Sequence, residues 1–294
     1  MALSTETHSL TRGHCSLVYD QLGASDSRHT LILLHGLASN ATRWHEFMQQ
    51  TRLTEQFDLL AMDLRGHGRS LVFEPFTRQD WVEDVHALLL AQQKPGVVVG
   101  HSMGAQIALD YASQYAAQKE CRLEALILID PIFPQALDGV LKKIARFRPL
   151  IKAACWLIRA GYAIGIHRRN YPQRDLQRLD QETRAFLAAN PDKRIADLYM
   201  NPLADLPYIP LANYLQDLYE VTRPLLPIAH IKVPVLVLLS EGASTSQTQT
   251  NKKLLSALPN LDIKTIDADH WLLTEKPLEA RETIEHWCEQ QIML

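Results

Sequence analysis

Gly100, Ser102 and Gly104 form a G-x-S-x-G sequence that follows the apolar run Val97–Val99 and precedes an alanine-rich helical pattern. A serine between a strand and a helix lies on a sharp, strained turn that exposes its hydroxyl at the carboxyl edge of a sheet. The flanking glycines avoid collisions in that turn. Because a serine hydroxyl attacks at neutral pH only when a base takes its proton, the pattern predicts that Ser102 is a nucleophile with a base nearby.

Three further motifs accompany the serine turn: HGL after the apolar run Leu31–Leu34, DLRGHGRS at Asp63–Ser70, and DHW at Asp269–Trp271, with EKP shortly after it. In this order, the four motifs resemble those of the α/β-hydrolase superfamily, in particular its capped serine esterases and lipases. The resemblance covers nearly the whole chain. It implies an α/β fold with a doubly wound, mostly parallel sheet and an inserted helical cap.

The resemblance also implies roles for several residues. His270 follows the last apolar run, where this superfamily places the base that accepts the serine proton. The backbone N–H groups of Leu37 and Met103 match the two donors of the oxyanion hole. We interpret His35, His67 and His101 as residues that pack and brace these loops, and Arg65 with Asp63 as a structural ion pair.

The acid of the expected Ser-His-acid triad departs from the superfamily pattern. Most relatives carry an aspartate after the seventh strand, but the run Val235–Leu239 continues into SEGASTS without one. Two carboxylates remain. Asp130 follows the run Ala125–Ile129, which corresponds to the sixth strand of the superfamily, and Glu241 follows the run Val235–Leu239, which corresponds to the seventh. We favour Asp130 because a buried strand would hold it beside the serine turn, and we keep Glu241 as the alternative.

Short β-rich runs alternate with longer helical patterns, which predicts a mostly parallel sheet covered on both faces. A capping box at Thr77–Asp80 predicts a helix that extends through Leu90, and Pro277–Gln291 predicts a closing surface helix. The predicted strands are Thr30–Leu34, Leu59–Met62, Val97–Val99, Ala125–Ile129, Val235–Leu239 and Ile263–Ile266.

The alternation of strands and helices stops between residues 131 and 228, where the pattern is helical and partly proline-rich. We therefore predict a core of residues 1–130 and 229–294, and a helical cap of residues 131–228 inserted between the sixth and seventh strands. Large apolar side chains of the cap could line a substrate pocket or form the cap's own core: Phe133, Trp156, Leu157 and Tyr162.

The segment Gly139–Arg174 holds nine lysines and arginines and no acidic residue. This run indicates either a patch for an anionic substrate or a membrane surface, or simply a solvated helix face. The apolar stretch Leu150–Ile166 is short for a membrane span and contains Lys152 and Arg159, so we predict a packed helix and no stable membrane insertion.

Composition is consistent with a soluble enzyme. The 294 residues include 30 basic and 33 acidic side chains, a net charge of −3, which argues against nucleic-acid binding. Four widely spaced cysteines and scattered histidines predict no disulfide, no metal and no cofactor. The amino terminus lacks the pattern of a secretory signal, so a cytoplasmic location is the default expectation.

Together these observations predict a serine hydrolase that cleaves carboxylic esters through an acyl-enzyme, with an apolar acyl or alcohol part of the substrate bound under the cap. A thioesterase, or a carbon–carbon hydrolase or lyase with the same triad, remains an alternative. So does a catalytically inactive, hydrolase-like binding protein. The substrate and the oligomeric state are left open by the sequence.

Overall fold

An eight-stranded sheet with the order β1-β2-β4-β3-β5-β6-β7-β8 runs through the computed structural model, which describes residues 5–24, 26–118, 120–199, 201–242 and 246–293. Strands β3 to β8 are parallel, and β1 and β2 add an antiparallel hairpin at one edge. The predicted α/β, mostly parallel fold is confirmed. The strands are β1 (Glu6–Arg12), β2 (Cys15–Leu22), β3 (His29–Leu34), β4 (Phe57–Met62), β5 (Gly96–His101), β6 (Leu123–Ile129), β7 (Val235–Ser240) and β8 (Leu261–Ile266).

Both faces of the central strands are buried, which explains why these strands are continuous apolar runs. Successive side chains of a strand point to opposite faces, so Leu31 and Leu33 belong to one apolar cluster and Ile32 and Leu34 to the other. One face is covered by α2 (Arg78–Gln92), α3 (Met103–Tyr115) and α10 (Thr248–Leu255). The other is covered by α1 (His45–Gln50), α11 (Leu272–Glu275) and α12 (Pro277–Gln291). The sheet is therefore doubly wound.

The six predicted strands all lie within β3 to β8, and the predicted helices are α2, which has the expected capping box, and α12. The β1–β2 hairpin was missed. All residues of β1 are exposed or half-buried, so its sequence carries no apolar run. Its strand conformation is stabilised by antiparallel pairing with β2, which the sequence pattern does not reveal.

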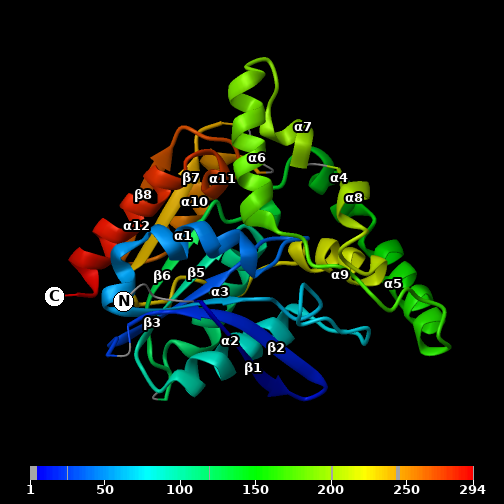
Figure 1. Cartoon of the computed structure of the whole chain (residues 1–294), viewed down its shortest axis with the longest axis horizontal. Coiled ribbons are helices and arrows are strands. Elements are labelled where there is room, and N and C mark those ends of the chain that lie inside the picture. Colours follow the sequence, from blue (N-terminus) through cyan, green and yellow to red (C-terminus); the bar gives the residue numbers. More distant parts are fainter. Residues whose placement is uncertain (1–4, 25, 119, 200, 243–245, 294) are drawn as a thin grey trace.

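Between β6 and β7 the described residues form helices and loops but no strand. A short 3-10 turn comes first, followed by α4 (Gly139–Arg146), α5 (Arg148–Ala163), α6 (Leu176–Ala189), α7 (Ile195–Tyr199), α8 (Pro202–Asp205) and α9 (Leu211–Val221). Figure 1 shows these helices, in green and yellow, gathered above the sheet and to its right. Whether they form a separate cap unit with the boundaries 131 and 228 stays a prediction.

Two expectations concern the amino terminus and the crossing of a membrane. Residues 1–4, which belong to the segment considered for a secretory signal, lie outside the described residues. Within the described ranges no helix has both the length and the apolar character needed to cross a bilayer.

Candidate active site

Ser102 lies between β5 and α3 with φ 56° and ψ −112°, a backbone conformation that residues with a side chain rarely adopt. Both flanking glycines are required by close backbone packing. A Cβ atom on Gly100 would lie 2.3 Å from the carbonyl oxygen of Gly104, and one on Gly104 would lie 2.4 Å from that of Leu34. The G-x-S-x-G pattern therefore allows the strand and the helix to meet closely enough to form this turn.

His270 lies in the loop between β8 and α11, and its Nε2 is 2.9 Å from the Oγ of Ser102. Both side chains are buried. His101 helps to hold the loop, because its Nε2–H donates a hydrogen bond of 3.0 Å to the carbonyl oxygen of His270. Burial, and secondarily the neighbouring His270, lowers the pKa of His101 to about 3, so its ring is neutral at physiological pH.

Asp130 follows β6 and accepts a hydrogen bond of 2.5 Å at Oδ2 from the Nδ1 of His270. Its other oxygen, Oδ1, accepts hydrogen bonds from the backbone N–H and the hydroxyl of Ser240, at 3.2 and 3.0 Å. Because Nδ1 carries the proton shared with Asp130, the Nε2 of a neutral His270 ring is left to accept the proton of Ser102. The three side chains are thus connected in the order needed for nucleophilic catalysis.

Glu241, the alternative acid, is exposed at the end of β7. Its backbone N–H donates to the carbonyl oxygen of Ile266, and no hydrogen bond joins its carboxylate to His270 in the described part of the chain. Residues 243–245 of the same loop lie outside the described residues. The geometry brings Asp130, and not Glu241, to the histidine.

The expected oxyanion donors belong to two segments that adjoin the serine. Met103 is the first residue of α3, where backbone N–H groups have no partner within the helix, and Leu37 follows β3 and lines the cavity that contains Ser102. A Cβ on Gly36 would lie 3.4 Å from the Cβ of Ser102, so this loop packs directly against the serine. No protein acceptor for the N–H of Leu37 or Met103 occurs among the described residues.

Two buried histidines brace the surrounding loops, as the sequence suggested. The Nδ1–H of His35 donates to the carbonyl oxygen of Gly36 at 2.8 Å, and its Nε2 accepts from the N–H of Leu64 at 3.1 Å. Burial lowers the pKa of His35, which keeps its ring neutral. His67 instead pairs with the buried Asp217 of α9 at 2.8 Å, and this pairing outweighs burial and raises the pKa of His67.

The prediction of an ion pair between Arg65 and Asp63 is wrong. Arg65 pairs with Asp84 of α2, with its Nη2 2.7 Å from the carboxylate, whereas Asp63 accepts from the guanidinium of Arg69 at 2.7 Å and from the N–H of Ala41. The backbone path of this loop brings each of the two side chains to a different partner. Arg65 therefore ties the loop to α2, and Asp63 ties it to the segment before α1.

A cavity of about 400 Å³ opens above Ser102 and His270. Most of its wall is apolar, and a few polar side chains also line it, among them Arg43, Tyr199 and Asp205. Apolar residues from α4 and α9 line the same cavity as the serine: Leu141, Ile144, Leu218 and Val221. The arrangement can hold an apolar group next to a nucleophilic hydroxyl.

None of the four large side chains suggested for the pocket lines this cavity. Phe133 is buried in the core cluster, and the hydroxyl of Tyr162 accepts a hydrogen bond from the N–H of Ala212. Trp156 and Leu157 are neither pocket lining nor cap core, because both are exposed on α5. Helical spacing places these two side chains on one face of α5, but tertiary packing decides what that face meets.

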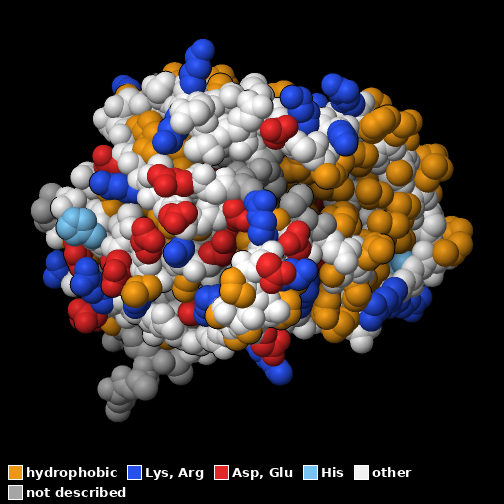
Figure 2. Space-filling model, turned by 90° about the horizontal axis from the view of Figure 1, so that it is seen from above, with side chains coloured by type: hydrophobic (Ala, Val, Ile, Leu, Met, Phe, Trp, Pro, Cys, Tyr) orange, Lys and Arg blue, Asp and Glu red, His pale blue; other side chains and the backbone are white. Residues whose placement is uncertain are grey.

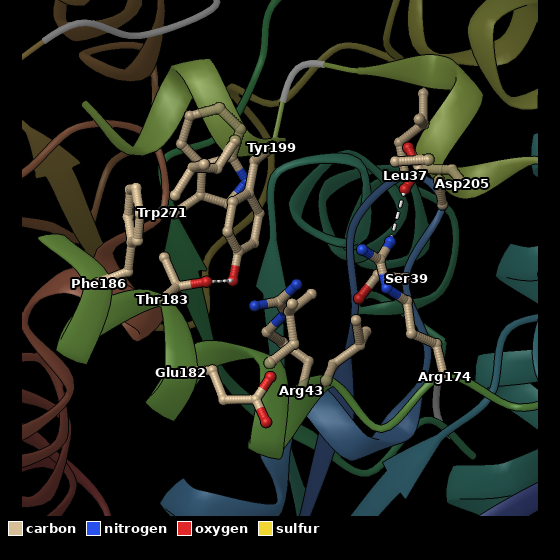
Figure 3. Close-up of a pocket in the computed structure, with 15 residues that line it drawn as sticks. Leu37, Ser39, Arg43, Arg174, Glu182, Thr183, Phe186, Tyr199, Asp205 and Trp271 are labelled. Carbon is tan, nitrogen blue, oxygen red and sulfur yellow. Dashed lines mark hydrogen bonds and ion pairs between the residues drawn. The ribbon is translucent and has the colours of Figure 1, made fainter. Parts of the chain in front are cut away.

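A second cavity of about 330 Å³ adjoins the first and shares Arg43, Tyr199 and Trp271 with it. Figure 3 shows Arg43 between the Tyr199 side and the Arg174 side of this cavity. Arg43 pairs with Asp180, which also accepts a hydrogen bond of 2.7 Å from the hydroxyl of Tyr199, and Arg174 pairs with Asp205 at 2.9 Å. Arg43 and Tyr199 were not identified from the sequence, because neither belongs to a motif. Trp271, in contrast, belongs to the DHW motif and follows His270 directly.

The chain belongs to the α/β-hydrolase family: the model described as "Alpha/beta hydrolase family" matches residues 31–282. Among curated relatives, the chain is 36% identical over 110 residues to lipase LipV of Mycobacterium tuberculosis, covering 37% of this chain and 39% of the lipase. It is 33% identical over 136 residues to monoacylglycerol lipase of Mycolicibacterium smegmatis, covering 44% of this chain and 46% of that lipase. The alignments thus span less than half the length of these relatives.

Among solved structures, that of E-2-(acetamidomethylene)succinate hydrolase superposes with a TM-score of 0.68, over 97% of this chain and 100% of that chain, at 19% identity. At this identity the superposition supports the fold alone. The family and the lipase relatives together support a hydrolase.

Proposed function

We propose that this chain is a serine hydrolase that cleaves carboxylic esters through an acyl-enzyme. The observation that carries the proposal is the unbroken hydrogen-bond sequence from Ser102 Oγ through His270 to Asp130, with distances of 2.9 and 2.5 Å. Its position on a strained turn, open to an apolar cavity, adds to this support.

In the proposed mechanism, the Oγ of Ser102 attacks the ester carbonyl carbon while the Nε2 of His270 takes the hydroxyl proton. Asp130 stabilises the resulting imidazolium through Nδ1–H. The oxyanion of the tetrahedral intermediate accepts hydrogen bonds from the N–H groups of Leu37 and Met103. His270 then gives its proton to the leaving alkoxide, and a water molecule activated by the same histidine hydrolyses the acyl-enzyme.

The proposed substrate is a small ester with an apolar acyl or alcohol part. Leu141, Ile144, Leu218 and Val221 supply an apolar wall next to Ser102, and the volume of about 400 Å³ suits a single chain of moderate length. Two of the curated relatives are named as lipases, which is consistent with such a substrate. The proposal includes no cofactor, metal or nucleic acid.

The decisive experiment compares nitrophenyl esters of increasing acyl length with acyl-CoA thioesters, alongside labelling by a fluorophosphonate probe. Rapid labelling with ester turnover supports the proposal. Faster turnover of thioesters than of esters would move the function to a thioesterase with the same residues. A chain that is neither labelled nor active on any ester would be a hydrolase-like binding protein instead.

We expect Asp130→Asn to lower kcat for the best ester about ten-thousandfold, because a neutral amide stabilises neither the required histidine tautomer nor the imidazolium. Glu241→Gln is the matched control and should change kcat less than about twofold, since Glu241 is exposed and no hydrogen bond joins its carboxylate to His270 among the described residues. Steady-state kinetics on both purified variants, with thermal unfolding to check folding, gives the comparison. The opposite ranking would assign the acid to Glu241.

The cavity wall predicts how acyl length is selected. Ile144→Trp should lower kcat/KM for octanoyl and longer esters at least about tenfold, because the larger ring occupies space beside Ser102, while the acetyl ester changes little. Leu278→Trp, at an exposed position of α12, is the matched control. An unaltered chain-length profile in Ile144→Trp would show that this wall does not contact the acyl chain.

A further inference from the structure

The outer face of α5 is apolar although it is exposed. Exposed apolar residues recur at helical spacing along α5 and at the residue that follows it: Leu150, Ala153, Trp156, Leu157, Ala160, Ala163 and Ile164. Trp156 has 70% of its surface exposed and Leu150 has 67%. A surface helix normally turns this face inward, so the stripe is a surface without an internal partner.

Neighbouring segments extend this stripe into a larger surface, which we call the α5 patch. Figure 2 shows hydrophobic side chains gathered over one whole end of the molecule, with basic side chains at the edges of this area. Its additional large members are Val140, Phe147, Ile166 and Leu203, all exposed.

The charged side chains of the segment 139–174, which supplies most of the α5 patch, all have one sign. Six of the nine basic residues of the segment 139–174 are exposed, and the segment has no acidic residue: Lys142, Lys143, Arg146, Lys152, Arg168 and Arg169. The other three are engaged: Arg148 stacks on Tyr219, Arg159 pairs with backbone carbonyl groups and Asn213, and Arg174 pairs with Asp205.

We propose that the α5 patch binds the surface of a lipid bilayer that contains anionic lipids. An apolar helix face with a tryptophan can enter the boundary between headgroups and acyl chains, and lysines and arginines at its rim are attracted to anionic headgroups. The positive charge favours an anionic bilayer over a second copy of the chain as the partner. Two chains associated through their α5 patches would place lysines and arginines of like charge close together.

The same surface leads to the cavity above Ser102. Val140 lines this cavity and is 56% exposed, and α4 also directs Leu141 and Ile144 into it. On the other side, Pro202 lines the cavity and the adjacent Leu203 is exposed. A chain bound to the bilayer through the α5 patch would therefore have an apolar path from the lipid to the cavity. Bilayer binding itself does not depend on the proposed hydrolysis.

Co-sedimentation with vesicles tests the proposal. The full chain is mixed with vesicles of phosphatidylcholine alone and of phosphatidylcholine with phosphatidylglycerol, and we expect stronger binding to the anionic vesicles, weakened by salt. Trp156→Gln with Leu157→Gln removes apolar area, and Lys142→Glu with Lys143→Glu reverses charge. Each pair should lower the partition coefficient at least about tenfold.

Matched controls use exposed residues of helices and strands on the core: Leu90→Gln with Leu278→Gln, and Lys253→Glu with Lys264→Glu. These should leave the partition coefficient unchanged. Ester turnover in solution, measured for every variant, reports folding separately. No binding to either vesicle, or equal loss in the control variants, would overturn the proposal. A stable dimer, detected by light scattering and abolished by Trp156→Gln with Leu157→Gln, would also overturn it.

Discussion

Replacing Ser102 with alanine is expected to reduce ester turnover about a million-fold and to abolish labelling by a fluorophosphonate. The change removes only the hydroxyl, and alanine can adopt the same φ of 56° at a cost similar to that of serine. The fold and the thermal midpoint should therefore stay near those of the unmodified chain. Mass spectrometry of the labelled protein and steady-state kinetics give the two measurements.

Ser39→Ala is the matched control for this variant. Ser39 lines the same cavity as Ser102, but no hydrogen bond joins it to His270 in the described residues. This control should keep labelling and turnover within about twofold, as expected when a residue outside the reacting set is changed. Persistent labelling or turnover in Ser102→Ala would remove Ser102 as the nucleophile.

The second large effect is expected for His270→Gln, which should lower kcat by a similar factor, about a million-fold, because base and nucleophile act as one unit. Glutamine can still form hydrogen bonds, but its amide cannot take the proton of Ser102 at neutral pH. The double variant with Ser102→Ala should be no slower than either single variant. Measurement of kcat for all three variants tests this lack of additivity.

His286→Gln controls for a general effect of losing a histidine, because His286 is exposed on α12 and contacts Gln290. It should retain full activity. If a preparation of His270→Gln free of contaminating esterase turned over ester at a near-normal rate, the proton would have another acceptor, and His270 would not belong to the mechanism.

The identity of the residue beside His270 could not be deduced from the sequence alone. Asp130 and Glu241 both follow core strands whose ends share an edge of the sheet, and the sequence favoured Asp130 without excluding Glu241. The pairing of β6 with β7 places the carboxylate of Asp130 against Ser240 and His270, and leaves Glu241 exposed. This outcome depends on the direction of each side chain at the end of its strand.

The error over Arg65 has the same cause. The loop 63–70 was recognised from its sequence, but the path of its backbone separates Asp63 from Arg65 and gives each a partner far away in the chain. The β1–β2 hairpin was missed for a different reason. Its outer strand buries none of its residues and is specified by hydrogen bonds to its neighbour, which leave little trace in composition.

By itself, the sequence determined the parallel core and the places of Ser102 and His270. Buried strands must be apolar on both faces, and the serine turn requires glycine where two backbone segments meet. Each of these requirements produces a local pattern in the amino-acid sequence. Tertiary structure alone decided which carboxylate meets His270, which side chains line the cavity, and that the stripe of α5 faces outward. A helical period shows that a stripe exists, but only packing shows what covers it.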